Sequence, residues 1–268
     1  MTGHTEMTEA GAATPQATSL YVYGVIPAAD AGNWPGADGL EAPDSTVRTV
    51  VAGELAALVS ALPSDRTPGR RDDLEAHRRV LSLANERGTT IPMRFGIVMD
   101  SEDLLREDLL GQHAPEFTDL LKKLDGHVQM TVRAFYGEDG LLPEVAESDP
   151  EIVRRTAAIQ GLSELESRQE RIDLGELIAA RVTARREQDE QSLMERLSPF
   201  ATDVRVDPPS SERVALNAQL LVRRDRRGAL DQAVGVLTTA LKGHLAIRYL
   251  GPLPPYSFTE LSLEAGGE

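Results

Sequence analysis

Short runs of β-branched and aromatic residues, separated by polar turns, predict three strands near the start of the chain. These strands cover residues 20–26, 46–52 and 55–62. Gly53 and Glu54 join the last two runs and indicate a hairpin. Residues 27–45 are rich in Gly, Pro, Ala and Asp, so they predict a long loop.

The hydrophobic period then changes from two residues to between three and four. Leu74, His77, Leu81 and Ala84 form one apolar stripe, which predicts a helix from Asp72 to Gly88. A mostly apolar strand is expected over residues 89–99, followed by a helix that Ser101 caps. Four further apolar residues at helical spacing predict a second clear helix closed by Gly126: Phe117, Leu120, Leu121 and Leu124.

Residues 127–136 show the cleanest alternation in the chain. One set of side chains is apolar, namely Val128, Met130, Val132, Ala134 and Tyr136. The other set is polar, namely His127, Gln129, Thr131 and Arg133. We therefore expect a strand with one buried face and one face in solvent.

No proline lies between Pro150 and Pro199, and the residues between them are those that favour helices. The segment is long enough for one bent helix or for a helical hairpin that breaks near residues 173–175. The end of the chain then predicts strands over 203–206, 214–223 and 245–250, with a helix over 228–242 between the last two.

From residue 127 on, the predicted elements follow the order βαββαβ, the split arrangement of a ferredoxin-like domain. The first half has a related but altered order. We therefore predict an α+β protein with two ferredoxin-like domains, the first modified and the second carrying a long helical insertion. The expected divisions are a disordered tail (1–18), an N-terminal domain (19–125), a C-terminal domain (126–250) and a Pro-rich tail (251–268).

Composition narrows the possible functions. The 268 residues include 43 Asp and Glu against 28 Lys and Arg, which gives a net charge of -15. Such a surface repels a phosphate backbone, so we expect no nucleic-acid partner. The absence of cysteine excludes disulfides, a thiolate nucleophile and Cys-ligated metal sites.

Signals for export or membrane insertion are also lacking in this sequence. The first 18 residues contain no apolar run of the kind a secretory signal needs. The longest apolar-looking stretch, residues 50–62, is interrupted by Glu54 and is shorter than the roughly 20 residues of a membrane span. We expect a cytoplasmic protein without a membrane span.

A search for catalytic and cofactor motifs finds none. The sequence has no phosphate-binding glycine loop, no nucleophile elbow and no pair of histidines at metal-binding spacing, so neither a catalytic residue nor a cofactor is expected. His77 lies on an apolar helical stripe, which favours a core or domain-interface histidine over a catalytic base. The basic run Arg223–Arg227, which includes Asp225, favours a solvated turn paired with nearby carboxylates over a site for an acidic partner.

Two segments are not explained by packing alone. The first is Ile91-Pro92-Met93-Arg94-Phe95-Gly96, and the second is Gly251-Pro252-Leu253-Pro254-Pro255-Tyr256-Ser257-Phe258. The second segment combines three prolines with two aromatic rings, which predicts a stiff extended tail. Such a tail either docks on its own protein or presents Tyr256 and Phe258 to a partner.

These segments, together with Tyr21-Val22-Tyr23-Gly24-Val25 and His77-Arg78-Arg79-Val80, resemble the gas vesicle protein L/F family. The resemblance covers nearly the whole chain after the first 18 residues, and the run from Gly251 to Phe258 is its most specific part. This chain departs from the family in having Leu253 at a position where an aromatic residue is usual.

The resemblance implies a non-enzymatic accessory protein of gas vesicle assembly, without a cofactor. It implies that the protein binds the hydrophobic major shell protein, helps its nucleation or limits its aggregation, and occurs as a minor vesicle component. Other gas vesicle accessory proteins are further expected partners. Candidate residues for partner binding or tail docking are Arg94, Phe95, Pro252, Pro254, Pro255, Tyr256 and Phe258. Two alternatives stay open: a ligand-binding module or small enzyme on ferredoxin-like domains, and a structural role in the vesicle wall.

Overall fold

The structure is a computed structural model that describes residues 18–32, 34, 37–40, 46–138 and 140–259. The chain divides into two compact units, one ending at Leu121 and the other beginning at Lys122. Each unit contains an antiparallel β-sheet with helices, so the predicted mixture of helix and sheet is confirmed. The expected tail over residues 1–18 lies outside the described residues apart from Thr18, as do residues 260–268.

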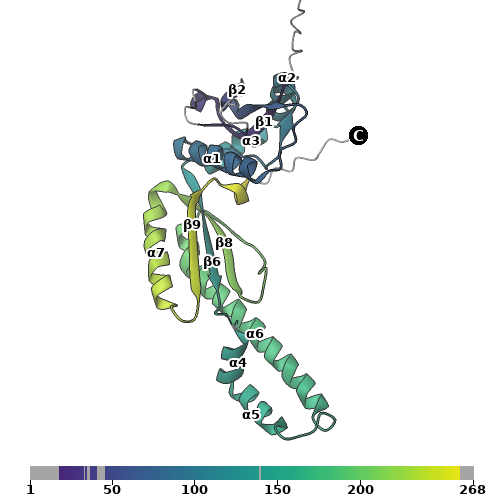
Figure 1. Cartoon of the computed structure of the whole chain (residues 1–268). Coiled ribbons are helices and arrows are strands. Elements are labelled where there is room, and N and C mark those ends of the chain that lie inside the picture. Colours follow the sequence, from purple (N-terminus) through teal and green to yellow (C-terminus); the bar gives the residue numbers. More distant parts are fainter. Residues whose placement is uncertain (1–17, 33, 35–36, 41–45, 139, 260–268) are drawn as a thin grey trace, which may run out of the picture. The chain divides into compact units, whose positions relative to one another are not determined.

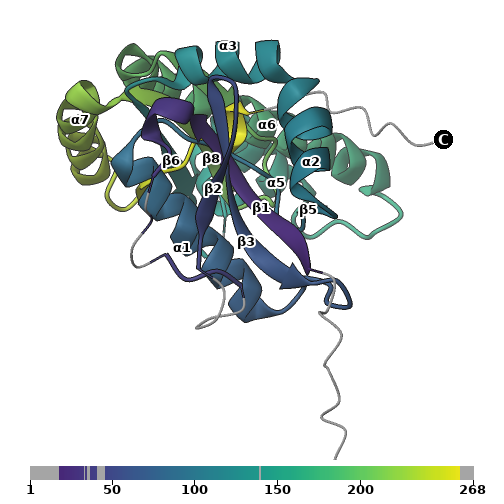
Figure 2. The ribbon, with the colours of Figure 1, turned by 90° about the horizontal axis from the view of Figure 1, so that it is seen from above.

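Unit 1 is built on a sheet in which the strand order is β2-β3-β1-β4, with β5 also pairing with β1 (Figure 2). Its strands are β1 (Thr18–Pro27), β2 (Arg48–Ala52), β3 (Leu55–Pro63), β4 (Ile91–Pro92) and β5 (Val98–Met99). The three long strands match the predicted runs, and Gly53 turns the β2–β3 hairpin with a positive φ of 59°.

Helix α1 (Arg71–Arg87) covers one face of this sheet. His77, Leu81 and Ala84 of the predicted stripe are buried, whereas Leu74 is only partly buried. Ala76, Val80, Leu81 and Ala84 pack in one cluster with side chains of β1 and β3. Gly24 of β1 is required for this contact, because a Cβ there would lie 2.8 Å from the Ile91 carbonyl oxygen and 3.0 Å from Leu81. Trp34 of the predicted long loop joins the same cluster, next to the short helix η1 (Ala28–Asp30).

The expected strand over residues 89–99 is wrong in its extent. Only the two ends pair with β1, as β4 and β5, and residues 93–97 form a loop between them. Pro92, which lacks an N–H donor, and Gly96, which has a positive φ of 96°, interrupt the ladder. The elements that follow are α2 (Glu102–Leu104), the π-helical η2 (Leu105–Gly111) and α3 (Ala114–Leu124). Ser101 caps α2, as predicted, by accepting the Leu104 N–H at 3.2 Å.

Unit 2 is built on a four-stranded sheet with the order β7-β8-β6-β9 (Figure 1). Its strands are β6 (His127–Phe135), β7 (Asp203–Val206), β8 (Val214–Arg223) and β9 (Ala246–Leu253). Apolar side chains of β6 and β8 form one core with α7 (Arg227–Ala240) and the last turns of α6 (Arg168–Leu197). Short helices η3 (Ser198–Phe200) and η4 (Arg224–Arg226) precede β7 and α7, and η5 (Tyr256–Phe258) follows β9.

The polar-rich segment between β6 and β7 forms a helical arm. Helices α4 (Leu142–Ser148) and α5 (Pro150–Ile159) pack against α6, and Figure 1 shows them extending with its first half beyond the end of the sheet. Of the two possibilities for residues 150–198, the hairpin is present. The break lies at residues 160–167 rather than near 173–175, because Gly161 turns the chain with a positive φ of 86° while Gly175 continues α6.

The prediction for the two faces of β6 is half right. Val128, Met130, Val132 and Ala134 are buried in the core as expected. On the other face Arg133 is exposed, but Gln129 and Thr131 are buried rather than in solvent. Strand β9 also runs three residues past the expected boundary at 250, so Leu253 pairs with Gln129 and begins to cover this face.

Among the described residues, no helix is long and apolar enough to cross a membrane.

Candidate partner-binding surfaces

The segment 91–96 is held in unit 1 by the aromatic residues of β1. The Tyr21 hydroxyl lies 2.9 Å from His77 Nδ1 and accepts the Gly96 N–H at 3.2 Å. The Met93 N–H donates to the Tyr23 carbonyl at 2.9 Å. Segments that are separate in the sequence and carry the family resemblance therefore meet at one place.

His77 is the centre of this cluster. Its ring stacks on Tyr23 at 5.8 Å between centroids and meets the Phe95 ring edge-on at 5.7 Å. Burial lowers the pKa of His77 to about 4, with a smaller contribution from the positive charge of Arg78, while a hydrogen bond with the Met93 backbone opposes the shift. His77 is therefore a buried, neutral core histidine that holds the loop, and the prediction of a core position from the apolar stripe is confirmed.

The loop leaves two side chains at the surface. Arg94 is exposed, and Phe95 is 36% exposed although its ring contacts both His77 and Tyr21. Because the backbone around them is fixed by the bonds to Tyr21 and Tyr23, these side chains are presented in a defined position. They form a small surface of one cation and one aromatic ring.

The C-terminal segment lies against unit 2 after the end of β9. Pro254, Pro255 and Phe258 are buried, with Phe258 only 2% exposed. The Ser257 N–H donates to Gln129 Oε1 at 2.9 Å, and the Arg205 guanidinium lies 5.8 Å from the centre of the Phe258 ring. These contacts favour docking on the protein itself for this part of the segment.

Other residues of the same segment remain accessible. Pro252 is exposed, and Tyr256 is 39% exposed. Gly251 before them has a φ of +140°, and a Cβ there would lie 2.6 Å from Met130 Sδ, so only glycine fits where β9 crosses β6. The segment thus offers Tyr256 to solvent while Phe258 anchors it.

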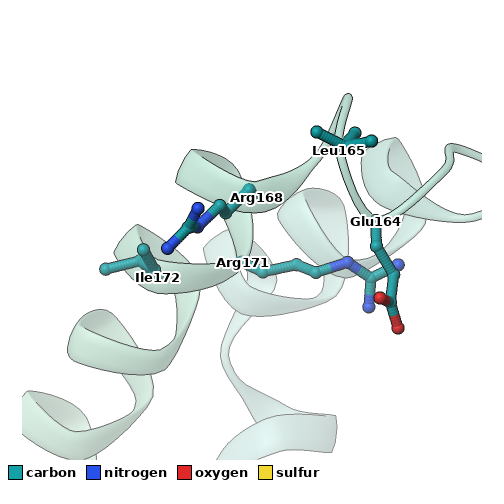
Figure 3. Close-up of a pocket in the computed structure, with 5 residues that line it drawn as sticks. All are labelled: Glu164, Leu165, Arg168, Arg171 and Ile172. Carbon is teal, nitrogen blue, oxygen red and sulfur yellow. The ribbon is translucent and has the colours of Figure 1, made fainter.

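The tip of the helical arm is a third surface, which the sequence patterns did not identify. Leu165 is 91% exposed, and with Ile172 it lines a hollow of about 480 Å³. Figure 3 shows Leu165 on the loop, Arg168 beside Ile172 on the helix, and Arg171 extending towards Glu164. Leu162 and Val153 of the same hairpin are exposed as well.

The loop that carries Leu165 is well ordered by its own hydrogen bonds. Ser163 donates its hydroxyl to Glu166 at 2.6 Å and its N–H to the same carboxylate at 3.1 Å. The buried Ser167 hydroxyl donates to the Ser163 carbonyl at 2.8 Å and accepts from Arg171 Nε at 2.8 Å. Because the backbone of this turn is already fixed, little backbone conformational entropy is lost when a partner buries the apolar side chain that the turn carries.

A polar cluster joins the base of the arm to the sheet. His244 lies 2.9 Å from Glu144 of α4 and 3.2 Å from Asp189 of α6. The Tyr136 O–H donates to Asp189 at 3.0 Å, and Arg185 pairs with both carboxylates at 3.3 Å. No sequence motif predicts this cluster, because its members are far apart in the sequence and are brought together only by the fold.

The basic run at residues 223–227 is paired locally, as the sequence suggests. Arg223 forms an ion pair with Asp225 at 2.8 Å, and Arg227 lies 3.5 Å from Asp231. Within the described residues, no group of three or more histidine, aspartate or glutamate side chains is arranged to hold a metal ion.

The family model that matches the chain is described as "Gas vesicle synthesis protein GvpL/GvpF", and it covers residues 19–260. Among curated proteins, gas vesicle protein F of Streptomyces sp. (strain CB03234) is 36% identical over 248 residues, covering 90% of this chain and 100% of that one. Gas vesicle protein F of Dolichospermum flosaquae is 26% identical over 245 residues, covering 90% and 98%.

Solved structures show the same architecture. The crystal structure of GvpF from Anabaena sp. PCC7120 has a TM-score of 0.81 at 25% identity and covers 91% of this chain and 99% of that one. The crystal structure of GvpF from Microcystis aeruginosa has a TM-score of 0.74 at the same identity and the same coverage. The likeness therefore extends over both units rather than over one of them.

Proposed function

Because this chain belongs to the gas vesicle synthesis protein GvpL/GvpF family, we propose that it is a non-enzymatic accessory protein that binds the hydrophobic major shell protein and assists vesicle nucleation and assembly. Family membership establishes a role in gas vesicles. The shell protein as partner, possible contacts with other vesicle proteins and a location in the cytoplasm at the vesicle are parts of the proposal.

The observation that carries the proposal is the apolar tip of the helical arm. Single exposed apolar side chains are common on soluble proteins, but here Leu165 and Ile172 share one hollow at the end of a protruding hairpin. The hydrogen bonds of Ser163 and Ser167 hold this surface in place. Such a surface suits an apolar segment of a client protein.

The charge of the chain supports the same role. With a net charge of -15, copies of the protein repel one another, and so do complexes that contain it. A hydrophobic client that is bound at a small apolar tip would be kept dispersed by the acidic body. Capture and dispersal then reside in different parts of one molecule.

The loop around Phe95 in unit 1 and the exposed Tyr256 in unit 2 are two further candidate surfaces for the same partner, each on its own. Arg94, next to Phe95, and Pro252, in the segment of Tyr256, are exposed as well. Pro254, Pro255 and Phe258 are buried, so we assign them to docking of the C-terminal segment. In unit 2, the strand order β7-β8-β6-β9 with α6 and α7 on one face supports a ferredoxin-like arrangement, and we propose a modified version for unit 1.

The test is co-purification of the shell protein with the full chain after co-expression. Replacing Leu165 with aspartate puts a carboxylate in place of the apolar side chain that lines the hollow together with Ile172. Burying one leucine is worth about 1.5–3 kcal/mol. We expect the amount of co-purified shell protein to fall about tenfold or more in L165D. Val236→Asp is the matched control, because Val236 is equally an exposed apolar residue but lies on α7.

The outcomes separate the two surfaces. If L165D keeps full binding while Phe95→Asp loses it, the surface around Phe95 is the binding site and the tip is not. If neither the wild-type chain nor any variant changes the recovery or solubility of the shell protein, the proposed function is wrong. A protein that stays in stoichiometric amounts in washed vesicles would instead support a structural role in the wall.

A further inference from the structure

Two arginines face each other on the sheet surface that α6 and α7 leave open. Arg133 of β6 is directly opposite Arg248 of β9, and both side chains are exposed. Like charges directly opposite on neighbouring strands reduce the stability of a sheet. In a chain with 43 acidic residues, such a pair calls for an explanation other than composition.

Both guanidinium groups are positioned by neutral partners. Arg133 Nε donates to the Asn217 side-chain oxygen at 2.9 Å, and the Arg248 guanidinium lies 5.1 Å from the centre of the Phe135 ring. Across the described parts of the chain, neither group has a carboxylate partner. Other exposed arginines do have one, as in Arg71 with Glu75 and Arg155 with Glu151.

Asp207, which follows β7 and donates its N–H to the Asn217 carbonyl at 2.9 Å, does not neutralise the pair. Asp207 accepts the side-chain amides of Asn217 and Gln219, each at 2.9 Å. Asn217 therefore lies between Asp207 and Arg133. Its side-chain amide donates to Asp207, and its side-chain oxygen accepts from Arg133. The two positive charges are oriented and left uncompensated.

The neighbouring strand edge indicates the shape of an occupant. Strand β9 is the last strand of the sheet, so its outer edge pairs with no other strand in the described ranges. Leu250 lies on the same face as Arg248 and is exposed. A hollow of about 660 Å³ beside the start of β9, lined by residues that include Lys242, Ala246 and Ile247, leaves room along this edge.

We propose that this arginine pair, Arg133 and Arg248, is a docking site for an extended acidic segment of a partner protein, which adds to the outer edge of β9. Carboxylates of the segment lie over the two guanidinium groups and relieve their mutual repulsion. Arginine suits this role because its planar fork binds a carboxylate through two hydrogen bonds. The site is distinct from the apolar tip of the arm and does not depend on the shell protein.

The test uses the full chain and a fluorescein-labelled peptide that alternates Glu and Val, followed by fluorescence anisotropy. The whole protein repels such a peptide, so binding requires a local positive site. We expect Arg133→Gln and Arg248→Gln each to weaken binding about tenfold. Arg154→Gln is the matched control, because Arg154 is an exposed arginine of α5 without a carboxylate partner in the described structure, and it should leave binding unchanged.

Further arms separate the possible ligands. A peptide with Pro in place of Val keeps the charge but lacks half of the backbone N–H groups needed for strand pairing, so it should bind clearly more weakly. Equal binding of that peptide, equal binding of a single-stranded oligonucleotide of the same charge, or an equal effect of Arg154→Gln would overturn the proposal. Circular dichroism of each variant, together with Arg248→Lys as a milder change, distinguishes lost contacts from lost folding.

Discussion

Burial keeps the His77 side chain neutral at neutral pH. The neutral ring packs against Phe95 and so supports the loop that carries it. The ring is 3% exposed and contacts Tyr21, Tyr23 and Phe95. Tyr23 is neutral as well, because burial raises its pKa to about 12. The cluster is thus an uncharged hydrogen-bonded unit at neutral pH.

The pKa of His77 predicts a loss of stability in weak acid. The folded value is about 4 against 6.5 for the free side chain, so between these values the unfolded chain binds more protons. The free energy of unfolding of unit 1 should therefore fall by about 3 kcal/mol as the pH decreases from 6.5 to 4. Trp34, the single tryptophan and a buried residue of unit 1, reports this in urea titrations by its fluorescence.

The comparison variants isolate this contribution. His77→Gln should flatten the pH dependence in that window, whatever its effect on stability at pH 7. His113→Gln should retain the slope, because His113 lies outside the cluster at the start of α3. Asp73, a second buried titratable group of α1, has a pKa below its usual value. Burial raises this pKa, but hydrogen bonds from two backbone N–H groups and the positive charge of Arg66 lower it by more. An unchanged slope in His77→Gln would contradict the assignment.

Among the elements, the helical arm depends on a few polar contacts rather than on a large core. Asp149 begins α5 by accepting the Glu151 N–H at 2.8 Å and the Ile152 N–H at 3.2 Å. Its second oxygen accepts from Arg181 of α6 at 2.9 Å. One side chain therefore caps one helix of the arm and ties it to the other.

Replacing Asp149 with alanine should loosen α5 without affecting the sheet. The first turn of α5 loses its cap and the contact with Arg181, so amide hydrogen exchange of residues 150–159 should become faster. Exchange in β6 and β8 should stay the same. Glu147→Ala is the control, since Glu147 is exposed and has no side-chain partner in the described structure; equal exchange in both variants would refute the role of Asp149.

For the whole molecule, the division into two units determines which part is expected to be stable alone. The core of unit 2 contains residues from Val128 to Leu245 and includes none from unit 1. The contacts of the C-terminal segment with Gln129 and Arg205 also lie within unit 2. Each sheet thus has its own set of packed helices.

A fragment that begins at Asp125 and runs to the end of the chain should fold by itself and unfold cooperatively in urea. A second fragment that stops at Leu250 lacks the Leu253–Gln129 pairing and the Ser257 hydrogen bond. Its free energy of unfolding should be lower by on the order of 2 kcal/mol. A longer fragment without a cooperative transition, or two fragments of equal stability, would contradict this account.

The elements of this protein could be predicted from the sequence to the extent that they depend on local periodicity. The stripe from Leu74 to Ala84 gave α1, the alternation from Val128 to Tyr136 gave β6, and Ser101 gave a helix start. The motifs around Tyr23, Phe95 and Tyr256 indicated the family to which the chain belongs. In each case the signal lies in the spacing of side chains, which the backbone geometry of a helix or strand sets directly.

Tertiary contacts decided the features on which binding depends. The sequence did not show that Gln129 and Thr131 are covered, that Phe258 is buried while Tyr256 is accessible, or that Leu165 stands at the tip of the arm. It also could not place Arg133 opposite Arg248, because residues 115 positions apart meet only through strand register. Periodicity fixes which face of an element is apolar, whereas exposure and charge pairing depend on what the rest of the chain brings to that face.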